Sequence, residues 1–229
     1  MSSKLLITGG DASLLDPAVS SGATSIALDL EDTVPDDKKV TTRDLVPRLL
    51  GMARPGGCKL GVRMSPLSTL DGLTDIQLVN GLERLPDFII LTKVESAPEV
   101  RIICDLLGGR LSGIPLSVII ETPQALANVD AIALASPRIE SLSFGGKDLS
   151  KANRMTRTWE PMLYARSRVV NAAAAAGVSV FDEPFHPRDD LAALRENCRR
   201  VRALGFTGKS TTDIRHPAVI NEVFAETGA

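Results

Sequence analysis

The sequence has few aromatic residues and no excess of basic charge. Aromatic residues make up 3% of its 229 residues, and 26 Lys and Arg residues face 28 Asp and Glu residues. Nucleic-acid-binding proteins need basic surfaces to neutralise phosphates, and binders of single strands also need aromatic side chains on which bases stack. The composition therefore argues against nucleic acid as a partner.

Cysteine is also scarce, and long apolar runs are missing. The three cysteines, Cys58, Cys104 and Cys198, have no C-x-x-C spacing, which indicates reduced thiols rather than disulfides or a zinc site. No uncharged apolar stretch reaches the roughly 18–20 residues that a membrane-spanning helix needs. Residues 1–10 lack the basic and apolar regions of a signal peptide. We therefore expect a soluble, cytoplasmic protein with no membrane partner.

Short runs of β-forming residues recur along the whole chain. Strands are predicted at residues 4–8, 25–30, 59–64, 87–94, 116–121, 141–145, 178–182 and 206–211. Their starts lie about 29 residues apart on average, which is the length that a strand, a helix and two loops require. Several runs are apolar at every position, as expected for parallel strands that are covered on both faces.

Helical patterns fill the intervals between these strands. Residues 71–84 carry apolar side chains on one face, residues 172–176 end a helix at Gly177, and residues 187–190 open another helix. Eight β/α units without a linker predict one domain over residues 1–229, a (β/α)8 TIM barrel. A doubly wound sheet is the alternative, but the segment ITGGDAS after the first strand does not match its G-x-G-x-x-G fingerprint.

Ionisable residues gather at the carboxyl ends of the predicted strands, where TIM barrels place their active sites. In chain order they are Asp29, Glu31, Asp32, Arg63, Lys93, Glu95, Glu121, Lys147, Asp148, Asp182, Glu183 and Lys209. They come from seven of the eight strands, a concentration that a barrel does not need for its stability alone. The pattern predicts an active site at this rim.

Two carboxylates on adjacent strands, Glu121 and Asp148, are the candidate ligands of a magnesium ion. Mg²⁺ takes one or two protein carboxylates and completes its octahedron with water and substrate oxygens. Such an ion chelates a 2-oxo acid and polarises its carbonyl group. Arg63 can bind the substrate carboxylate with its planar guanidinium, and the acids Glu31 and Asp32 can accept a proton.

Structural roles also account for several of these residues taken singly. Glu121 and Asp148 could be acids at helix N-termini, where the helix dipole favours them. Arg63 could pair with a neighbouring acid, and Lys93 could pair with Glu95 two residues along the same strand. Schiff-base chemistry at Lys209 would need a desolvated lysine. Neither His186 nor His216 is assigned to catalysis.

Six sequence runs then suggest a family. In order they are LDLEDTVPDDKKVTTR, GVRMSP, TKVESAPEV, VIIETPQAL, SFGGKDLS and RALGFTGKSTTDIRHPAVI. Together they resemble the citrate lyase β-subunit-like branch of the HpcH/HpaI aldolase superfamily, which includes malyl-CoA lyases. The resemblance implies a Mg²⁺-dependent (β/α)8 lyase, trimeric or hexameric, that makes or cleaves carbon–carbon bonds in 3-hydroxy-acyl thioesters.

The resemblance also implies roles for particular residues. It makes Glu121 and Asp148 the metal ligands, Arg63 the residue that holds the oxo acid, and Glu31 and Asp32 active-site acids. The backbone at Gly145 and Gly146 would lie against the substrate carboxylate. Lys38 and Arg43 would contact the phosphates of coenzyme A, although surface charge is the competing interpretation for this pair.

The sequence departs from the family pattern in several places. Lys147 precedes Asp148 where an acid is common, Thr92 replaces a proline, and the segment STTDIRHPAV after the last strand is long. A chain ending at Ala229 is also expected to lack the C-terminal segment that covers the site in many relatives and can supply a catalytic acid.

These departures leave two further functions open. One is a citrate lyase β-like subunit that binds its ligand but does not turn over alone. The other is an aldolase for free 2-oxo-acid adducts, although the histidine that such aldolases carry near the second strand is missing here. The acyl group, the oxo acid and the direction of the reaction are not fixed by the sequence.

Overall fold

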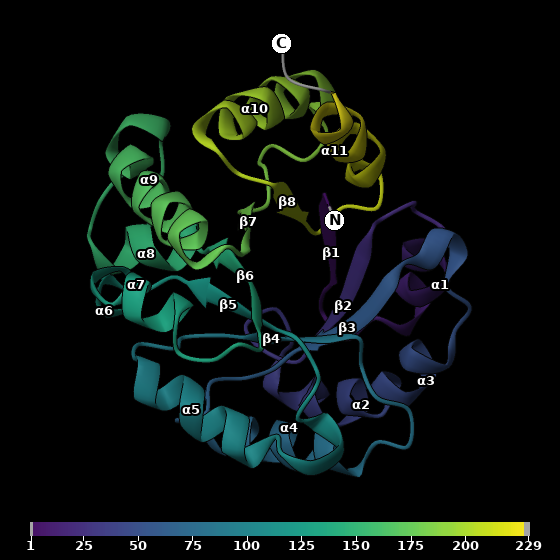
Figure 1. Cartoon of the computed structure of the whole chain (residues 1–229). Coiled ribbons are helices and arrows are strands. Elements are labelled where there is room, and N and C mark those ends of the chain that lie inside the picture. Colours follow the sequence, from purple (N-terminus) through teal and green to yellow (C-terminus); the bar gives the residue numbers. More distant parts are fainter. Residues whose placement is uncertain (1, 227–229) are drawn as a thin grey trace.

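The computed structural model describes residues 2–226, and its eight parallel strands form one closed barrel in sequence order, β1 to β8 (Figure 1). The strands are β1 (Ser3–Ile7), β2 (Ser25–Asp29), β3 (Lys59–Arg63), β4 (Phe88–Leu91), β5 (Leu116–Ile120), β6 (Ile139–Phe144), β7 (Ser179–Asp182) and β8 (Gly208–Thr211). The barrel closes where β1 pairs with β8, with Lys4 opposite Ser210. The predicted TIM barrel is confirmed, and the doubly wound alternative is wrong.

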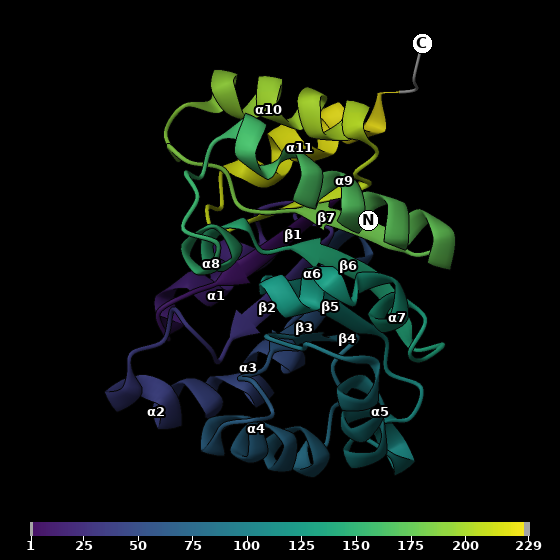
Figure 2. The ribbon, with the colours of Figure 1, turned by 90° about the vertical axis from the view of Figure 1, so that its left-hand side faces the viewer.

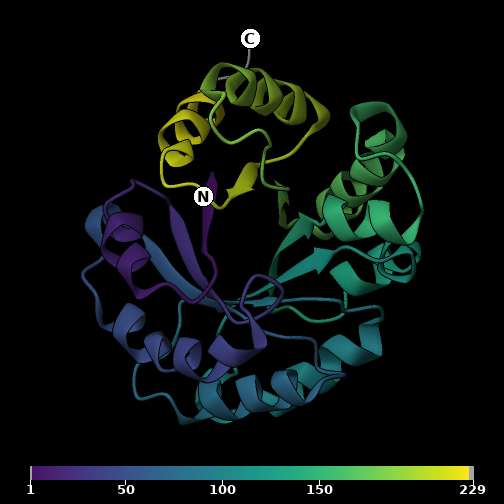
Figure 3. The same cartoon turned by 180° about the vertical axis from the view of Figure 1, so that it is seen from behind.

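Helices surround the barrel on all sides, as the views from the side and from behind show (Figures 2 and 3). They are α1 (Leu15–Val19), α2 (Lys39–Arg43), α3 (Leu45–Gly51), α4 (Leu70–Gly81), α5 (Ala97–Leu106), α6 (Pro123–Ala127), α7 (Val129–Ala133), α8 (Gly146–Ala152), α9 (Trp159–Ala176), α10 (Leu191–Leu204) and α11 (His216–Ala225). Four short 3₁₀ turns lie in the loops: Ala12–Leu14, Asp36–Lys38, Pro55–Gly57 and Gly109–Leu111. Within residues 2–226, no helix is both long and apolar enough to cross a membrane.

Two apolar layers lie on the two sides of the barrel strands, and a third buried cluster, which includes Leu194 and Ile220, packs α10 against α11. The larger layer lies between the strands and the helices, where side chains such as Val62, Val118 and Val169 are fully buried. The smaller one fills the barrel interior and includes Phe88 and Ile119. Alternating small and large residues fit this narrow interior, because a Cβ on Gly61 would lie 2.8 Å from the Phe88 ring.

A lysine is buried inside the barrel near the amino-terminal ends of the strands. The ammonium of Lys4 donates to the hydroxyl of Ser117 at 2.7 Å and lies 4.1 Å from the centroid of the Phe181 ring. No carboxylate lies within ion-pair distance of Lys4 in residues 2–226. Burial lowers the pKa of Lys4 from 10.5 to about 7, because the charged form loses its hydration.

Most predicted elements lie within a few residues of the observed ones, and two boundaries differ for clear reasons. The strand predicted at 87–94 ends at Leu91, because Lys93 adopts a left-handed backbone with φ of 51°. The helix predicted to open at residues 187–190 begins at Leu191, where the Asp190 carboxylate accepts from the N–H of Ala193 at 2.8 Å. The predicted helix end at Gly177 is confirmed by its φ of 68°.

Candidate active site

The carboxyl ends of the strands border a cavity of about 370 Å³, the size of a small-molecule site. Its wall includes four of the predicted site acids and bases, Asp32, Arg63, Glu121 and Asp148, together with Gly145 and Gly146. The cavity also contacts Lys147 and Glu183, which the sequence placed at the rim without a specific role, and Arg157, His186 and Arg188, which it did not place there. Half of the twelve rim residues predicted from the sequence thus line one space.

Arg63, at the end of β3, is held by the carboxylate of Asp29 at the end of β2. Its Nε and Nη2 atoms donate to the two oxygens of Asp29, each at 2.6 Å. Burial alone would raise the pKa of Asp29, but the charge and hydrogen bonds of Arg63 lower it. The third nitrogen, Nη1, lies 3.3 Å from Glu31. Arg63 thus forms the structural ion pair that the sequence allowed and also faces the cavity.

Lys93 joins four acids that follow three different strands, β2, β5 and β6. Its ammonium lies 3.0 Å from Glu31, 3.2 Å from Asp32 and 3.7 Å from Asp148. Its main-chain N–H donates to Oε1 of Glu121 at 2.9 Å. Because Lys93 lies in a turn beyond β4, it does not face along a strand with Glu95, and the ion pair considered for those two residues is not formed. Sequence reasoning identified Lys93 at the rim but gave it the wrong partner.

The buried acids carry more negative charge than their protein neighbours balance. Burial, followed by the nearby charge of Glu31, raises the pKa of Glu121 to about 8. Burial also raises the pKa of Glu31, whose Oε2 atom accepts no hydrogen bond and has Nη1 of Arg63 3.3 Å away as its ion-pair partner. A buried carboxylate without sufficient partners is stabilised by a further cation. The donor set therefore fits a hard divalent cation such as Mg²⁺.

This fit depends on ligands from outside the protein as well. Across residues 2–226, no three His, Cys, Asp or Glu side chains form a ready metal cluster. Glu121 comes directly before α6 and Asp148 lies in the first turn of α8, so both also occupy the helix N-terminal positions considered as their structural role. Two carboxylates with water and substrate oxygens are a common arrangement for magnesium.

The loop after β6 is pressed against the acids around it. A Cβ on Gly145 would lie 2.3 Å from Cβ of Glu121, and one on Gly146 would lie 2.5 Å from Oε1 of Glu183. Only glycine allows the backbone to approach so closely. The two glycines line the cavity, so their predicted contact with a substrate carboxylate remains compatible with their position.

Lys38 and Arg43, predicted to contact coenzyme A, do not line this cavity. Lys38 is exposed in the turn before α2. The guanidinium of Arg43 is bound to Asp71 at 2.6 Å and to Asp75 at 2.7 Å, which ties α2 to α4. Their role toward coenzyme A stays a prediction.

Two other residues considered at the sequence level have structural partners. The ammonium of Lys209 is buried and lies 2.5 Å from Asp182, an ion pair that favours a structural role over Schiff-base chemistry. His216 is buried, with Thr211 at 2.9 Å from Nδ1 and the carbonyl oxygen of Arg188 at 2.7 Å from Nε2. Both ring nitrogens of His216 are therefore occupied.

Sequence reasoning missed Arg157 and gave no role to His186, although both line the cavity. Arg157 lies in the loop between α8 and α9, far along the chain from any strand end. His186 comes after β7, and its position beside a proline suggested only a loop role. The one sequence signal near His186 was the run of charged residues after β7. Such a run predicts a charged segment but does not say which residues it will contact.

The comparisons agree with this geometry. The family described as HpcH/HpaI aldolase/citrate lyase matches residues 3–214, so this chain belongs to that family. The resemblance inferred from the six sequence runs is confirmed.

Two relatives match nearly the whole chain. It is 32% identical to a (3S)-malyl-CoA thioesterase of Cereibacter sphaeroides, over 99% of this chain and 78% of the relative. It is 30% identical to an L-malyl-CoA/β-methylmalyl-CoA lyase of Rhodobacter capsulatus, over 96% of this chain and 78% of the relative. The relatives thus include an enzyme named as a malyl-CoA lyase and an enzyme named as a malyl-CoA thioesterase.

Solved structures share the same fold. RipC from Yersinia pestis superimposes with a TM-score of 0.85 at 30% identity, covering 99% of this chain and 96% of RipC. The protein CitE of Mycobacterium tuberculosis, solved with magnesium, acetoacetate and coenzyme A, gives a TM-score of 0.83 at 20% identity and covers 99% of this chain and 81% of CitE.

Proposed function

We propose that this chain is a Mg²⁺-dependent carbon–carbon lyase, or the corresponding condensing enzyme, for a 3-hydroxy-acyl thioester such as a malyl- or citryl-CoA-like compound. Its products would be a 2-oxo acid and an acyl thioester. The observation that carries this proposal is the meeting of Arg63, Glu121 and Asp148 at one cavity, with the acids Glu31 and Asp32 beside them.

Glu121 and Asp148 would hold the magnesium ion. When bound, the ion would act as a Lewis acid that polarises the keto group of the oxo acid. The raised pKa of Glu121 supports this role, since a buried carboxylate of this kind gains most from a neighbouring cation. CitE of M. tuberculosis, which has the same fold, binds magnesium.

Arg63 would bind and orient the carboxylate of the oxo acid. Its bond to Asp29 fixes the guanidinium plane before any ligand arrives, so little side-chain entropy is lost on binding. Main-chain groups at Gly145 and Gly146 would contact the same end of the substrate. The close packing of this loop against Glu121 and Glu183 keeps it rigid.

A carboxylate of the Glu31 and Asp32 pair would move the proton. In the cleavage direction it would accept the proton of the 3-hydroxyl group while the adjacent carbon–carbon bond breaks. The electron pair of that bond passes to the thioester fragment as an enolate, which then takes up a proton to become the acyl thioester. Condensation would run through the same steps in reverse. The ammonium of Lys93, 3.0 Å from Glu31, would stabilise the ionised form of the base.

The first experiment measures binding of oxaloacetate, glyoxylate and pyruvate by calorimetry, with and without Mg²⁺. We expect binding of at least one oxo acid that requires Mg²⁺ and is lost in Glu121→Ala. Glu95→Gln is the matched control, because it neutralises an acid at the next strand end that does not line the cavity. Unchanged Mg²⁺-dependent binding in Glu121→Ala would contradict the metal assignment.

A product assay with malyl-CoA then identifies the reaction. Glyoxylate and acetyl-CoA indicate a lyase, malate and free coenzyme A indicate a thioesterase like the C. sphaeroides relative, and binding without products indicates a subunit that needs a partner. One observation favours the aldolase for free 2-oxo-acid adducts: neither Lys38 nor Arg43 lines the cavity. Failure of coenzyme A to compete with the oxo-acid substrate would support that alternative.

A further inference from the structure

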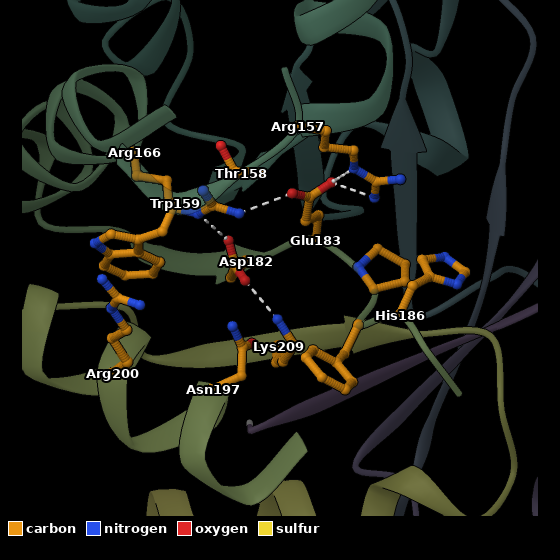
Figure 4. A pocket seen from close by; sticks show the side chains of 12 residues that line it. Arg157, Thr158, Trp159, Arg166, Asp182, Glu183, His186, Asn197, Arg200 and Lys209 are labelled. Atoms are coloured by element: carbon orange, nitrogen blue, oxygen red, sulfur yellow. Dashed lines mark hydrogen bonds and ion pairs between the residues drawn. The ribbon is translucent and has the colours of Figure 1, made fainter. Parts of the chain in front are cut away.

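A second cavity, of about 210 Å³, lies between α9 and α10 beside the ends of β7 and β8 (Figure 4). It shares part of its wall with the candidate active site, since Arg157, Glu183, Pro184 and His186 line both cavities. A water molecule occupies about 30 Å³ in the liquid. The second cavity therefore has room for a small polar group and several waters.

The lining of this second cavity is more positive than negative. Four cationic side chains, Arg157, Arg166, Arg200 and Lys209, face two carboxylates, Asp182 and Glu183. Such an excess of positive charge beside a partly enclosed space attracts anions.

The two carboxylates are already shared among three of the cations. Asp182 accepts from Nε of Arg166 at 3.0 Å and from the ammonium of Lys209 at 2.5 Å. Glu183 accepts from Nη2 of Arg166 at 2.7 Å and from Nε of Arg157 at 2.9 Å. Figure 4 shows these bonds as one connected row across the wall. The row fixes the cations in place without adding enough negative charge to neutralise them.

Arg200 is the cation with the least compensation. Its guanidinium carbon lies 3.9 Å from the centroid of the Trp159 ring, so the ring holds it from one side. Its carboxylate partner, Glu160, is 3.7 Å away, and the two side chains are 50% and 80% exposed. An ion pair so long and so exposed is weak. Most of the five N–H donors of Arg200 are therefore available to a ligand.

Two further groups show that this wall is polar and positively charged. The side-chain oxygen of Asn197 is buried without a hydrogen-bond partner, so it can accept a hydrogen bond from a water that sits beside the anion. Partial burial and the positive charges of Arg157 and Arg188 lower the pKa of His186, which reflects the positive field at the shared wall.

We propose that this second cavity is an oxyanion-binding subsite, which takes a phosphate or carboxylate group beside the candidate active site. Arg157 and Arg200 are its main ligands, because their guanidinium groups supply N–H donors. The oxyanion comes either from the far end of a substrate that extends across the shared wall or from a separate small anion. The proposal concerns binding alone and does not depend on the lyase reaction.

The subsite has a built-in reporter, because Trp159 in its wall is the single tryptophan of the chain. Titration of the whole protein with inorganic phosphate, followed by tryptophan emission and by calorimetry, measures occupancy directly. Succinate serves as the carboxylate probe. We expect saturable binding that weakens about tenfold or more in Arg200→Gln and in Arg157→Gln, since each loses charge-assisted hydrogen bonds.

The matched control is Arg199→Gln, which removes an equal charge from the same helix but not from the cavity wall. It should bind phosphate as the unmodified protein does. No saturable binding of either probe, or equal affinities in Arg199→Gln, Arg200→Gln and Arg157→Gln, would overturn the proposal. Phosphate binding should also persist in Glu121→Ala, so failure of the metal assignment is distinguished from failure of the subsite.

Coenzyme A distinguishes the two sources of the oxyanion. If the group belongs to the substrate, coenzyme A displaces phosphate and itself binds more weakly to Arg200→Gln. If the oxyanion is a separate ligand, phosphate binds equally well at saturating coenzyme A. Either result supports the subsite, and each assigns it a different occupant.

Discussion

The main-chain N–H of Lys93 donates to the Glu121 carboxylate at 2.9 Å, while the side chain of the same lysine reaches Glu31, Asp32 and Asp148. One residue thus contacts the four acids that the sequence assigned to the site. The left-handed backbone of Lys93, with φ of 51°, is what allows its N–H and its ammonium to serve different acids. The four acids are therefore arranged around a lysine rather than around one another.

Replacement of this lysine should make the protein more dependent on a divalent cation. In Lys93→Met the carboxylates lose their ammonium and repel one another, so the thermal midpoint without metal should fall. Added Mg²⁺ should raise the midpoint of Lys93→Met by a few degrees more than that of the unmodified protein, because a bound ligand stabilises the folded state.

Thermal denaturation with EDTA and with Mg²⁺ measures this difference. Lys59→Met is the control, since Lys59 pairs with Glu140 at 3.3 Å near the other end of the barrel. Equal Mg²⁺ shifts in Lys93→Met and the control would show that the ammonium does not neutralise these acids.

Asp29→Asn should impair the reaction although Asp29 does not line the cavity. Asparagine cannot accept both bonds from Arg63, so the guanidinium loses its fixed plane. We expect kcat/KM to fall about a hundredfold, as a displacement of about 1 Å can cause. Steady-state kinetics and circular dichroism test this together. Asp130→Asn, which removes an exposed partner of Arg168, should retain full activity.

Gly145→Ala should damage both stability and metal binding. The new methyl group would lie 2.3 Å from Cβ of Glu121, so the loop or the acid must move. Overpacking of this kind destabilises by about 1–3 kcal/mol. Urea unfolding and Mg²⁺ titration measure the two effects. Gly113→Ala is the control, because its methyl group would meet nothing within 4 Å; a similar loss there would refute the steric explanation.

The buried Lys4 should make the protein more stable at alkaline pH. The pKa of Lys4 is about 7 in the folded state, whereas a solvated lysine, as in the unfolded chain, has a pKa of 10.5. Between these values the unfolded chain binds more protons, so the free energy of unfolding should rise with pH through this window. Below pH 7 the buried charge remains a penalty, of about 5 kcal/mol at most.

Urea unfolding at pH 6 and at pH 9 checks this dependence. In Lys4→Met the contribution of Lys4 to this pH dependence should disappear. The free energy of unfolding at pH 6 should then move toward the free energy of unfolding at pH 9. Lys38→Met is the control: it replaces an exposed lysine and should leave the pH dependence of the free energy of unfolding unchanged. A slope that persists in Lys4→Met would assign the pH dependence to other groups.

The sequence predicted the barrel because each strand carries its own signal. Runs such as Leu116–Ile120 are apolar throughout, and their regular spacing leaves few other topologies. The placement of Glu121 and Asp148 at the rim was predicted for the same reason, since the end of a parallel strand has a fixed place on the rim. The prediction of residues at strand ends therefore follows directly from the prediction of the strands.

The partners of these residues were harder to predict. The geometry of Lys93 depends on a turn whose backbone angle leaves no pattern in the sequence. Arg157 reaches the site from a loop between two helices, where no periodicity fixes a direction. Arg43 carries the expected charge near the expected strand, but the buried Asp75 from a distant segment binds it. Such pairings depend on tertiary contacts rather than on local sequence.

The seam between β1 and β8 links residues from opposite ends of the chain, with Ser3 opposite Lys209, and Asn221 adds a hydrogen bond to the carbonyl oxygen of Gly22. During synthesis, one edge of β1 therefore stays unpaired until β8, near the other end of the chain, has left the ribosome. Contacts so distant in sequence slow folding. A permuted gene that starts at an exposed loop and joins the old termini would make β8 and β1 neighbours in translation, and the nascent barrel would no longer depend on its last strand to cover its first.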